Sequence, residues 1–359
     1  MASGRMNGRV TIKDVAEQAH VSFKTVSNVV NDTGNMRPET RRHVQKVLKE
    51  MGYLANVSAR SLRTGTNKLI GLGIDTFAQP FAPYFAGQVI AAARDKGYAV
   101  VVDTYGDDIE SIISDATRIA ADGWILHVTA PWENEGETLL QEYPVVAVGE
   151  QHSFNKADSV TMPNVQAVKD ITTTLLAMGH RKVALIGEPP EWNILHKKGM
   201  SDVQLHELAL NSSQGAQELR TRGYVEAFDD AGIPINWDMM LPGYSWTRSS
   251  GSRAANELLD KGVVPEVVVC LNDALALGAI HSFQLHELNV PQDIQVTGFD
   301  NITESEYSNP PLTTIDPSVE EYAQTAVTML IERIEGYTGP ARSTVTQYSF
   351  VERQSASLK

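Results

Sequence analysis

The sequence of 359 residues contains a single cysteine, Cys270, which excludes a disulfide within the chain. The thiol lies in the apolar run 266–271, a pattern typical of a small buried side chain rather than a nucleophile. The chain has no run of about 18 apolar residues, the length of a membrane span. Residues 1–9 contain no apolar segment of the kind found in signal peptides. These absences favour a cytoplasmic protein with no membrane partner.

Motifs that hydrolases, kinases and metalloproteases require are also missing. There is no Gly-x-Ser-x-Gly and no phosphate loop that ends in Gly-Lys-Ser/Thr. The glycines of 71–73 form too short a motif for a dinucleotide site, and the pairs 206–207 and 286–287 lack the second histidine of a zinc helix. The sequence therefore predicts no catalytic residue, no metal site and no cofactor.

Charge is distributed unevenly along the chain. The formal net charge is −14, yet residues 1–65 hold 11 Lys and Arg against 5 Asp and Glu, a net +6 that leaves −20 for the remainder. Phosphate backbones repel acidic surfaces, so only the amino-terminal segment suits a nucleic acid partner. This asymmetry is typical of a DNA-binding head attached to an acidic body.

The head is predicted to contain three short helices. Thr11 caps the first, and Asp14 places a carboxylate in its first turn. Ser22 caps the second, while the third begins at Pro38 and stops at Gly52. The tight turn between the first two helices predicts a helix-turn-helix.

The second helix exposes side chains that can hydrogen-bond base edges or phosphates, while its valines face the core. These side chains are Phe23, Lys24, Thr25, Ser27 and Asn28. Thr11, Ser22 and Asn31 complete the predicted DNA-binding set. The alternative is a three-helix bundle that only caps a larger domain, and the exposed polar face argues against it.

The head resembles the DNA-binding domain of the lactose-repressor (LacI/GalR) family. The resemblance covers residues 10–19, 21–31, 37–41 and 52–56 without gaps. It implies that Phe23, Lys24 and Asn28 read bases in the major groove of operator DNA. An asparagine at position 28 suggests a contact with adenine.

Residues 56–65 read as a linker, and the resemblance gives this segment a further role. In the family it forms a hinge helix, and two such helices from a dimer enter the minor groove. Leu62 falls on the position of the apolar wedge that kinks the duplex. Ala59 and Arg60 would line the same groove.

From residue 68 onward, short apolar runs alternate with helical stretches. Strands are predicted at 69–74, 99–103, 124–128, 145–149, 182–187, 267–270 and 294–298. Helices are predicted at 86–96, 109–122, 138–142, 167–178, 250–261 and 274–288. This βαβ repetition indicates doubly wound parallel sheets, and its recurrence in two halves predicts a ligand cleft between them at the strand carboxyl ends.

The resemblance continues through the body and implies the family's effector domain, which is related to periplasmic sugar-binding proteins. Arg220, Trp246, Asn272 and Asp300 fall on positions that contact the effector. Sugar hydroxyls can bond to Arg, Asn and Asp, and sugar C–H faces can stack on an indole ring.

Other candidate effector-binding residues follow predicted strands, where packing or helix capping is the alternative role. They are Asp75, Phe81, Phe85 and Trp132.

The predicted fold is an all-α helix-turn-helix head (1–55), a hinge (56–66) and an α/β periplasmic-binding-protein-like body (67–359) with two doubly wound parallel-sheet subdomains. An exported solute receptor would need only the body, and the basic head argues against it. The predicted function is a sequence-specific repressor that binds a palindromic operator and is controlled by a small-molecule effector. A mono- or oligosaccharide is the first expectation, and a nucleoside or purine-type corepressor is the alternative.

Some features depart from the family pattern. The segment 189–217 is longer than expected, which indicates either a functional or a disordered loop. Pro163 and Pro317 stand where the family usually has polar residues. The chain ends without an apolar heptad tail, which favours a homodimer over a tetramer.

Overall fold

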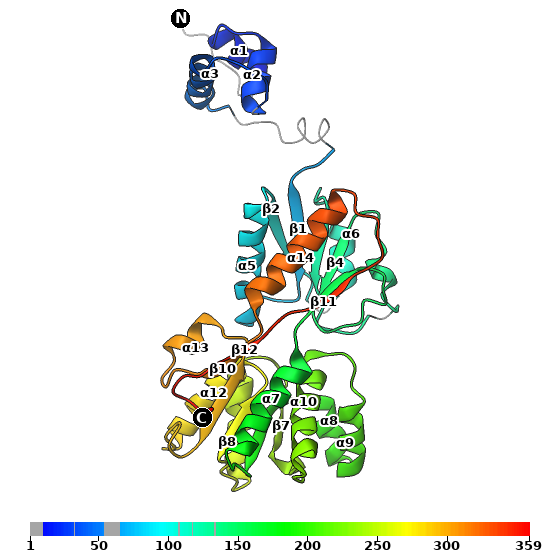
Figure 1. The fold of residues 1–359 in the computed structure, drawn as a ribbon, viewed down its shortest axis with the longest axis vertical. Coiled ribbons are helices and arrows are strands. Elements are labelled where there is room, and N and C mark those ends of the chain that lie inside the picture. The colour runs from blue at the N-terminus through cyan, green and yellow to red at the C-terminus, as the bar shows by residue number, and fades with distance from the viewer. Residues whose placement is uncertain (1–9, 32, 54–64, 107, 117, 133) are drawn as a thin grey trace, which may run out of the picture. The chain divides into compact units, whose positions relative to one another are not determined.

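A computed structural model describes residues 10–31, 33–53, 65–106, 108–116, 118–132 and 134–359 (Figure 1). These residues fall into two compact units, which divide between Asn67 and Lys68.

The amino-terminal unit is a small helical domain. Its helices are α1 (Ile12–Gln18), α2 (Phe23–Val30) and α3 (Pro38–Glu50). Thr11 and Asp14 form a reciprocal capping box at the start of α1, and the Ser22 hydroxyl accepts the Thr25 backbone N–H at the start of α2. The core consists mainly of Val15, Val26, Val29, Val44 and Val47. The predicted helix starts are confirmed.

The second unit contains two six-stranded sheets, and the first has the order β11-β5-β4-β3-β1-β2 with every pair parallel. Its strands are β1 (Leu69–Ile74), β2 (Ala99–Thr104), β3 (Trp124–His127), β4 (Val145–Val148), β5 (Asp158–Thr161) and β11 (Ser343–Val345). The helical elements of this half are α5 (Phe81–Asp95), α6 (Ile109–Ala116), η1 (Glu137–Leu139) and α14 (Val319–Ile334). Ile125 faces the core with α5 and α14, whereas its neighbours Trp124 and Leu126 pack on Ile112 of α6. Helices therefore cover both faces of this sheet.

The second sheet has the order β12-β10-β9-β8-β6-β7, and only β12 runs antiparallel to its neighbour. Its strands are β6 (Val183–Glu188), β7 (Met240–Pro242), β8 (Val267–Cys270), β9 (Gln295–Phe299), β10 (Thr313–Asp316) and β12 (Ser349–Val351). Its helical elements are α7 (Asn164–Ala177), α8 (Pro190–Lys197), α9 (Asp202–Leu210), α10 (Ala216–Ala231), η2 (Trp237–Met239), α11 (Arg248–Asp260), α12 (Asp273–Leu285) and α13 (Thr303–Tyr307). Helices α7 and α10 pack on one face, and α11 and α12 on the other. Cys270 is buried in the apolar core between this sheet and helices α11 and α12. Burial raises the pKa of its thiol.

All seven predicted strands are present to within one residue at each end. The doubly wound arrangement of both halves is confirmed. Strands β5, β7, β10, β11 and β12 were not predicted, because they are short and several carry polar side chains. The long segment 189–217 contains two helices, α8 and α9, so the expectation of a loop was wrong.

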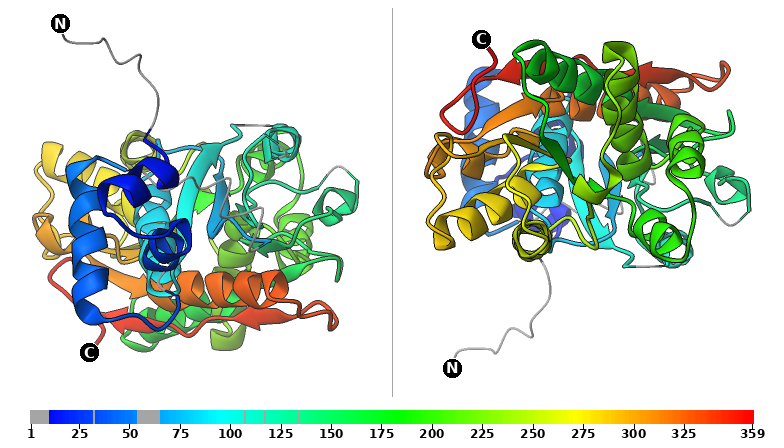
Figure 2. Two further views of the ribbon diagram at one scale, coloured as in Figure 1. Left: turned by 90° about the horizontal axis from the view of Figure 1, so that it is seen from above. Right: turned by 90° about the horizontal axis from the view of Figure 1, so that it is seen from below.

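The chain crosses between the two sheets three times: after β5, after β10 and after β11. In Figure 2 the last crossing, in red, runs along one side of this unit. The buried residue Thr346 joins all three crossings. Its N–H donates to the Thr161 carbonyl at 3.0 Å, and its hydroxyl donates to the Pro317 carbonyl at 2.9 Å.

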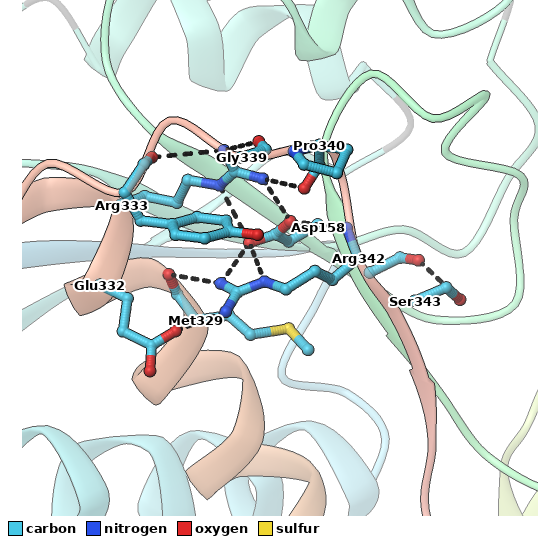
Figure 3. A network of polar contacts seen from close by, with 10 residues as sticks. Asp158, Met329, Glu332, Arg333, Gly339, Pro340, Arg342 and Ser343 are labelled. Atoms are coloured by element: carbon cyan, nitrogen blue, oxygen red, sulfur yellow. Dashed lines mark hydrogen bonds and ion pairs between the residues drawn. The ribbon is translucent and has the colours of Figure 1, made fainter.

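A polar network anchors the edge of the first sheet around Asp158, whose side chain is inaccessible to solvent (Figure 3). Arg333 of α14 and Arg342 before β11 each donate two side-chain hydrogen bonds to this carboxylate, at 2.7 to 3.2 Å. The ring of Tyr337 lies 4.6 and 4.4 Å from the two guanidinium groups. Burial opposes ionisation, but the hydrogen bonds from the two arginines hold the pKa of Asp158 below its usual value. The network fixes β11 to β5.

We expect Asp158→Asn to destabilise the second unit by about 3 kcal/mol, because removing one member of a buried ion cluster leaves the other charges uncompensated. Urea unfolding followed by circular dichroism measures the change. Glu332→Gln is the control, since it removes only the more exposed partner of Arg342 and should cost about 1 kcal/mol or less. Equal effects of the two substitutions would contradict the assigned role.

Candidate effector cavity and DNA-binding helix

Helix α2 presents the predicted DNA-reading side chains. Phe23 is 54% exposed, although it is a large apolar residue, and Lys24 is also exposed. Both side chains are therefore accessible to a partner. Ser22 and Thr25 bond to each other through their hydroxyls at 2.9 Å, and Ser27 and Asn31 also bond to each other. These four side chains thus stabilise the ends of α2, while Phe23 and Lys24 are exposed and Asn28 is half-buried.

Asn28 is held against Gly34 in the turn after α2. Gly34 has φ +78°, and a Cβ atom there would lie 2.6 Å from the Asn28 side-chain nitrogen. The Thr33 N–H donates to the Asn28 carbonyl at 2.9 Å. The turn therefore needs glycine for its backbone conformation and for the space beside the amide. The predicted hinge residues Ala59, Arg60 and Leu62 lie outside the described residues.

The second unit contains a cavity of about 480 Å³ that is lined from both subdomains. Asp75, Phe81, His127 and Glu150 contribute from the side of the first sheet. Arg220, Trp246, Asn272 and Asp300 contribute from the second. Residues 211–218, between α9 and the first turns of α10, form a third side. This is the volume of a small-molecule site, which commonly spans roughly 300 to 1,000 Å³.

Arg220 is the one lysine or arginine among the cavity-lining residues that the structure describes. Its guanidinium donates to the Asn164 side-chain oxygen at 2.6 Å and to the Leu271 carbonyl at 2.5 Å. It also lies 3.6 Å from the Asp300 carboxylate and 3.6 Å from the centre of the Phe299 ring. These partners offset the cost of burying the charge, and burial lowers the pKa of Arg220.

Three carboxyl groups near Arg220 have raised pKa values. Burial raises the pKa of Asp300 to about 8, with Arg220 opposing the shift and Asp273 adding to it. Burial likewise raises the pKa of Glu150 to about 7 and that of Asp273 to about 7. Asp300 and Glu150 can therefore donate as well as accept hydrogen bonds near neutral pH. The φ of Asp300 is +113°, a strained conformation of the kind that clusters at functional sites.

The structure places the predicted effector residues in different surroundings. Asp75, Phe81, Arg220, Trp246, Asn272 and Asp300 line the cavity. The Asn272 side-chain oxygen also caps α12 by accepting from Leu275 N at 2.8 Å. Among the residues that the structure describes, Phe85 and Trp132 are not part of the lining. Phe85 is fully buried and stacks on Phe81, while Trp132 packs in the cluster on the α6 face of the first sheet.

Several lining residues were not predicted. Glu150 lies two residues after the end of β4, so the rule that ligands bind at strand carboxyl ends could have identified it. His127 ends β3, and its ring lies beside the rings of both Phe81 and Phe85. Burial lowers the pKa of His127, while Asp75 opposes the shift. Its Nδ1 is buried and has no hydrogen-bond partner within the described part of the chain. Residues 211–217 carried no sequence signal, because their place at the cavity depends on how α9 packs.

No cluster of three or more His, Cys, Asp or Glu side chains suited to a metal ion occurs in the described residues. None of the helices described there is both long and apolar enough to span a membrane.

Comparisons with known proteins agree with this arrangement. Residues 11–56 match the family described as bacterial regulatory proteins, lacI family, and residues 172–356 match the periplasmic binding protein-like domain. The chain is 31% identical over 334 residues to the HTH-type transcriptional repressor PurR of Pasteurella multocida, covering 90% of this chain and 92% of that protein.

Solved structures show the same similarity. A LacI-type transcription regulator from Bifidobacterium animalis has a TM-score of 0.75 and 42% identity, covering 80% of this chain and 99% of that one. The complex of the transcriptional regulator CelR with cellobiose has a TM-score of 0.67 and 25% identity, covering 97% of this chain and 100% of that one.

We expect Gly34→Ala to weaken operator binding about tenfold or more, because the new methyl group displaces the Asn28 amide and one bidentate base contact contributes roughly 1–3 kcal/mol. A gel-shift titration measures the change. Gly52→Ala is the matched control: its φ of +63° imposes similar strain, but the new Cβ would meet open space. Equal losses of operator affinity in both variants would show that strain alone is responsible.

We expect thermal stability to fall as the pH rises from about 4, the unfolded pKa of Asp, towards the folded value of about 8 for Asp300. In this interval the folded state holds a proton that the unfolded state has released, so each pH increase favours unfolding. Asp300→Asn should reduce this slope in melting temperatures measured from pH 5 to 9. Glu207→Gln, an exposed change on α9, should leave it intact. An unchanged slope in Asp300→Asn would refute the assignment.

Proposed function

Because the chain belongs to the LacI family of bacterial regulatory proteins, we propose that it is a sequence-specific transcriptional repressor controlled by a small molecule in the cavity. The observation that carries this proposal is the exposure of Phe23 and Lys24 on α2, beside Asn28, in the unit that matches the family's DNA-binding domain. Side chains on a recognition helix read base edges in the major groove. The site of action would be the cytoplasm, where the operator lies.

We propose a homodimer as the DNA-binding form. A palindromic operator presents two equal half-sites, and a two-fold dimer matches them with two copies of α2. Leu62, with Ala59 and Arg60, would enter the minor groove between the half-sites, as the resemblance to the lactose-repressor family implies.

The cavity chemistry favours an uncharged effector. Arg220 is the one arginine or lysine among the described lining residues, and its guanidinium already donates to Asn164 and Leu271, so an anionic ligand would find little free positive charge. A hydrogen-bonding ring can instead use Arg220 and Asp300 while it packs on Trp246.

The similarity to repressors named PurR supports a purine-type or nucleoside corepressor more strongly than the sugar that the sequence first suggested. A sugar is the second candidate, and the cellobiose complex of a protein similar over 97% of this chain supports it. Both candidates are neutral and bear hydrogen-bonding rings.

The effector would act by changing the relation between the two subdomains. Arg220 bonds to Asn164 at the first residue of α7, directly after the first crossing, and Thr346 joins that crossing to the other two. A ligand that pulls on Arg220 therefore acts on the chain segments that connect the halves. Linkage requires that the effector and the operator change each other's affinity by the same factor, commonly worth about 1–3 kcal/mol.

The proposal is tested with a palindromic operator library and a panel of nucleobases, nucleosides and sugars. We expect one neutral class to raise the melting temperature and to shift operator affinity about 5- to 150-fold, up for a corepressor and down for an inducer. Thermal shift identifies the ligand, and gel shift gives the sign.

The matched variants are Arg220→Gln and Arg253→Gln. The first should abolish the ligand effect while the ligand-free operator affinity persists. The second alters an exposed arginine of α11 that does not line the cavity, so its response should be normal. If neither the ligand-free nor the ligand-bound protein binds an operator specifically, the proposal is wrong.

A further inference from the structure

The turn after β9 is held in place by the side chain of Asn301. Asp300 and Asn301 both have positive φ, +113° and +51°, which asparagine and aspartate tolerate better than most other residues. The Asn301 side-chain nitrogen donates to one oxygen of Asp316 at 2.9 Å, and its oxygen accepts from the Arg353 guanidinium at 2.8 Å. Asp300 lines the effector cavity. Asn301 therefore fixes the backbone from which a cavity residue projects.

Asp316 ends β10 in the second subdomain, and its carboxylate also bonds to the first. Its other oxygen accepts the N–H of Ser318, the N-cap residue of α14, at 2.8 Å. The Ser318 side chain makes no cap hydrogen bond, so Asp316 supplies an acceptor and a negative charge at the start of this helix. Burial raises the pKa of Tyr84 on α5, and the charges of Asp316 and Glu320 add to the shift. The Asp316 carboxylate thus faces both subdomains.

Helix α14 is a packed element of the first subdomain. Val319, Tyr322, Ala323 and Ala326 lie in the same apolar core as α5. The Tyr322 ring lies 5.2 Å from the ring of Phe85 on α5. With 16 residues the helix is about 24 Å long, and Figure 1 shows it in orange along this half of the unit. A displacement of its first turn is therefore carried to its other end.

The other end of α14 lies beside the residue at which the second unit begins. Glu335, the C-cap of α14, has its Oε1 3.9 Å from Nζ of Lys68. Lys68 also donates from Nζ to the Tyr98 hydroxyl at 3.0 Å, and its carbonyl accepts the Ala99 N–H at 2.8 Å. The ion pair is largely exposed and contributes little to stability, so its importance is its position. The chain from the helical domain enters the second unit at Lys68.

We propose that Asp316 is a positioning residue that couples the effector cavity to α14 and, through α14, to the chain at Lys68. One carboxylate oxygen holds the turn that carries Asp300, and the other holds the first turn of α14. A movement of the turn is therefore passed to the helix. This inference rests on the proposed function, because it specifies how the same cavity would act on the DNA-binding unit.

Hydrogen exchange of the full-length, ligand-free protein, measured by mass spectrometry, tests the coupling. Asp300→Gly perturbs the cavity, because it removes the carboxyl group while glycine adopts the positive φ without strain. Exchange is followed in peptides that cover 65–72 and 331–337, the two segments that meet at the far end of α14. We expect Asp300→Gly to speed exchange there about two- to thirtyfold, the range that substitutions along a coupled network produce.

The response should disappear when Asp316→Asn is also present. This substitution turns one acceptor oxygen into a donor, which then faces the donor of Asn301 or of Ser318 and breaks one of the two bonds. Asn301→Asp should have the same result, because it places two carboxylates against each other.

The exchanged pair, Asn301→Asp together with Asp316→Asn, should restore the response. The amide introduced at position 316 donates to the carboxylate at 301, and its oxygen accepts the Ser318 N–H, while Arg353 keeps its acceptor. Asp293→Asn is the matched control. Asp293 accepts two hydrogen bonds from Asn289 within one loop and is not among the described lining residues, so the response should persist.

Three results would overturn the inference. They are unchanged exchange at 65–72 and 331–337 in Asp300→Gly, an equal change with and without Asp316→Asn, and no recovery in the exchanged pair. The measurement uses neither ligand nor DNA. A gel shift of the wild-type protein with the palindromic operator library therefore decides separately whether the repressor function stands.

Discussion

The buried guanidinium of Arg220 is the constraint on which the effector cavity depends. A charge in this position is tolerable only if its donors are satisfied, and the partners come from separate elements: Asn164 from α7, Leu271 after β8 and Asp300 after β9. The ring of Phe299 covers its face. The same arrangement raises the pKa of Asp300, because a carboxyl shielded from water stays protonated even beside a cation. One buried charge thus fixes the strand ends, while burial keeps the pKa of Asp300 raised against the influence of that charge.

This constraint also connects the cavity to the junction of the two subdomains. Asn164 is the first residue of α7 and follows the first crossing, whose Thr161 carbonyl accepts from Thr346. Thr346 in turn bonds to the second crossing at Pro317. In the proposed mechanism, ligand contacts with Arg220 and a change in the angle between the halves would therefore share a short series of hydrogen bonds. In a LacI-family regulator, such a series of hydrogen bonds gives a physical basis for linking effector occupancy to DNA affinity.

Much of this architecture could be predicted from the sequence, because buried parallel strands appear as continuous apolar runs and helix caps have distinct residue types. Strand β5 escaped prediction, since Asp158 and Ser159 are stabilised there by partners 175 to 184 residues away. Phe81 and Phe85 stack on one face of α5, and periodicity cannot tell which of the two reaches the cavity. The position of Gln214 depends on the packing of α9 on α10, which no local pattern encodes. The positions of Asp75 and Asp300 at the cavity could be predicted, because each residue directly follows a strand.

The return of the chain through β11 and β12 has a consequence for biosynthesis. Strand β11 completes the first sheet beside β5, and β12 completes the second beside β10. The first sheet therefore cannot acquire its full set of strands until residue 345 has been synthesised, and the second not until residue 351. Contacts so distant in sequence form slowly. During synthesis, the second unit therefore exposes two incomplete sheet edges on the ribosome. Aggregation and chaperone binding compete with folding at this stage.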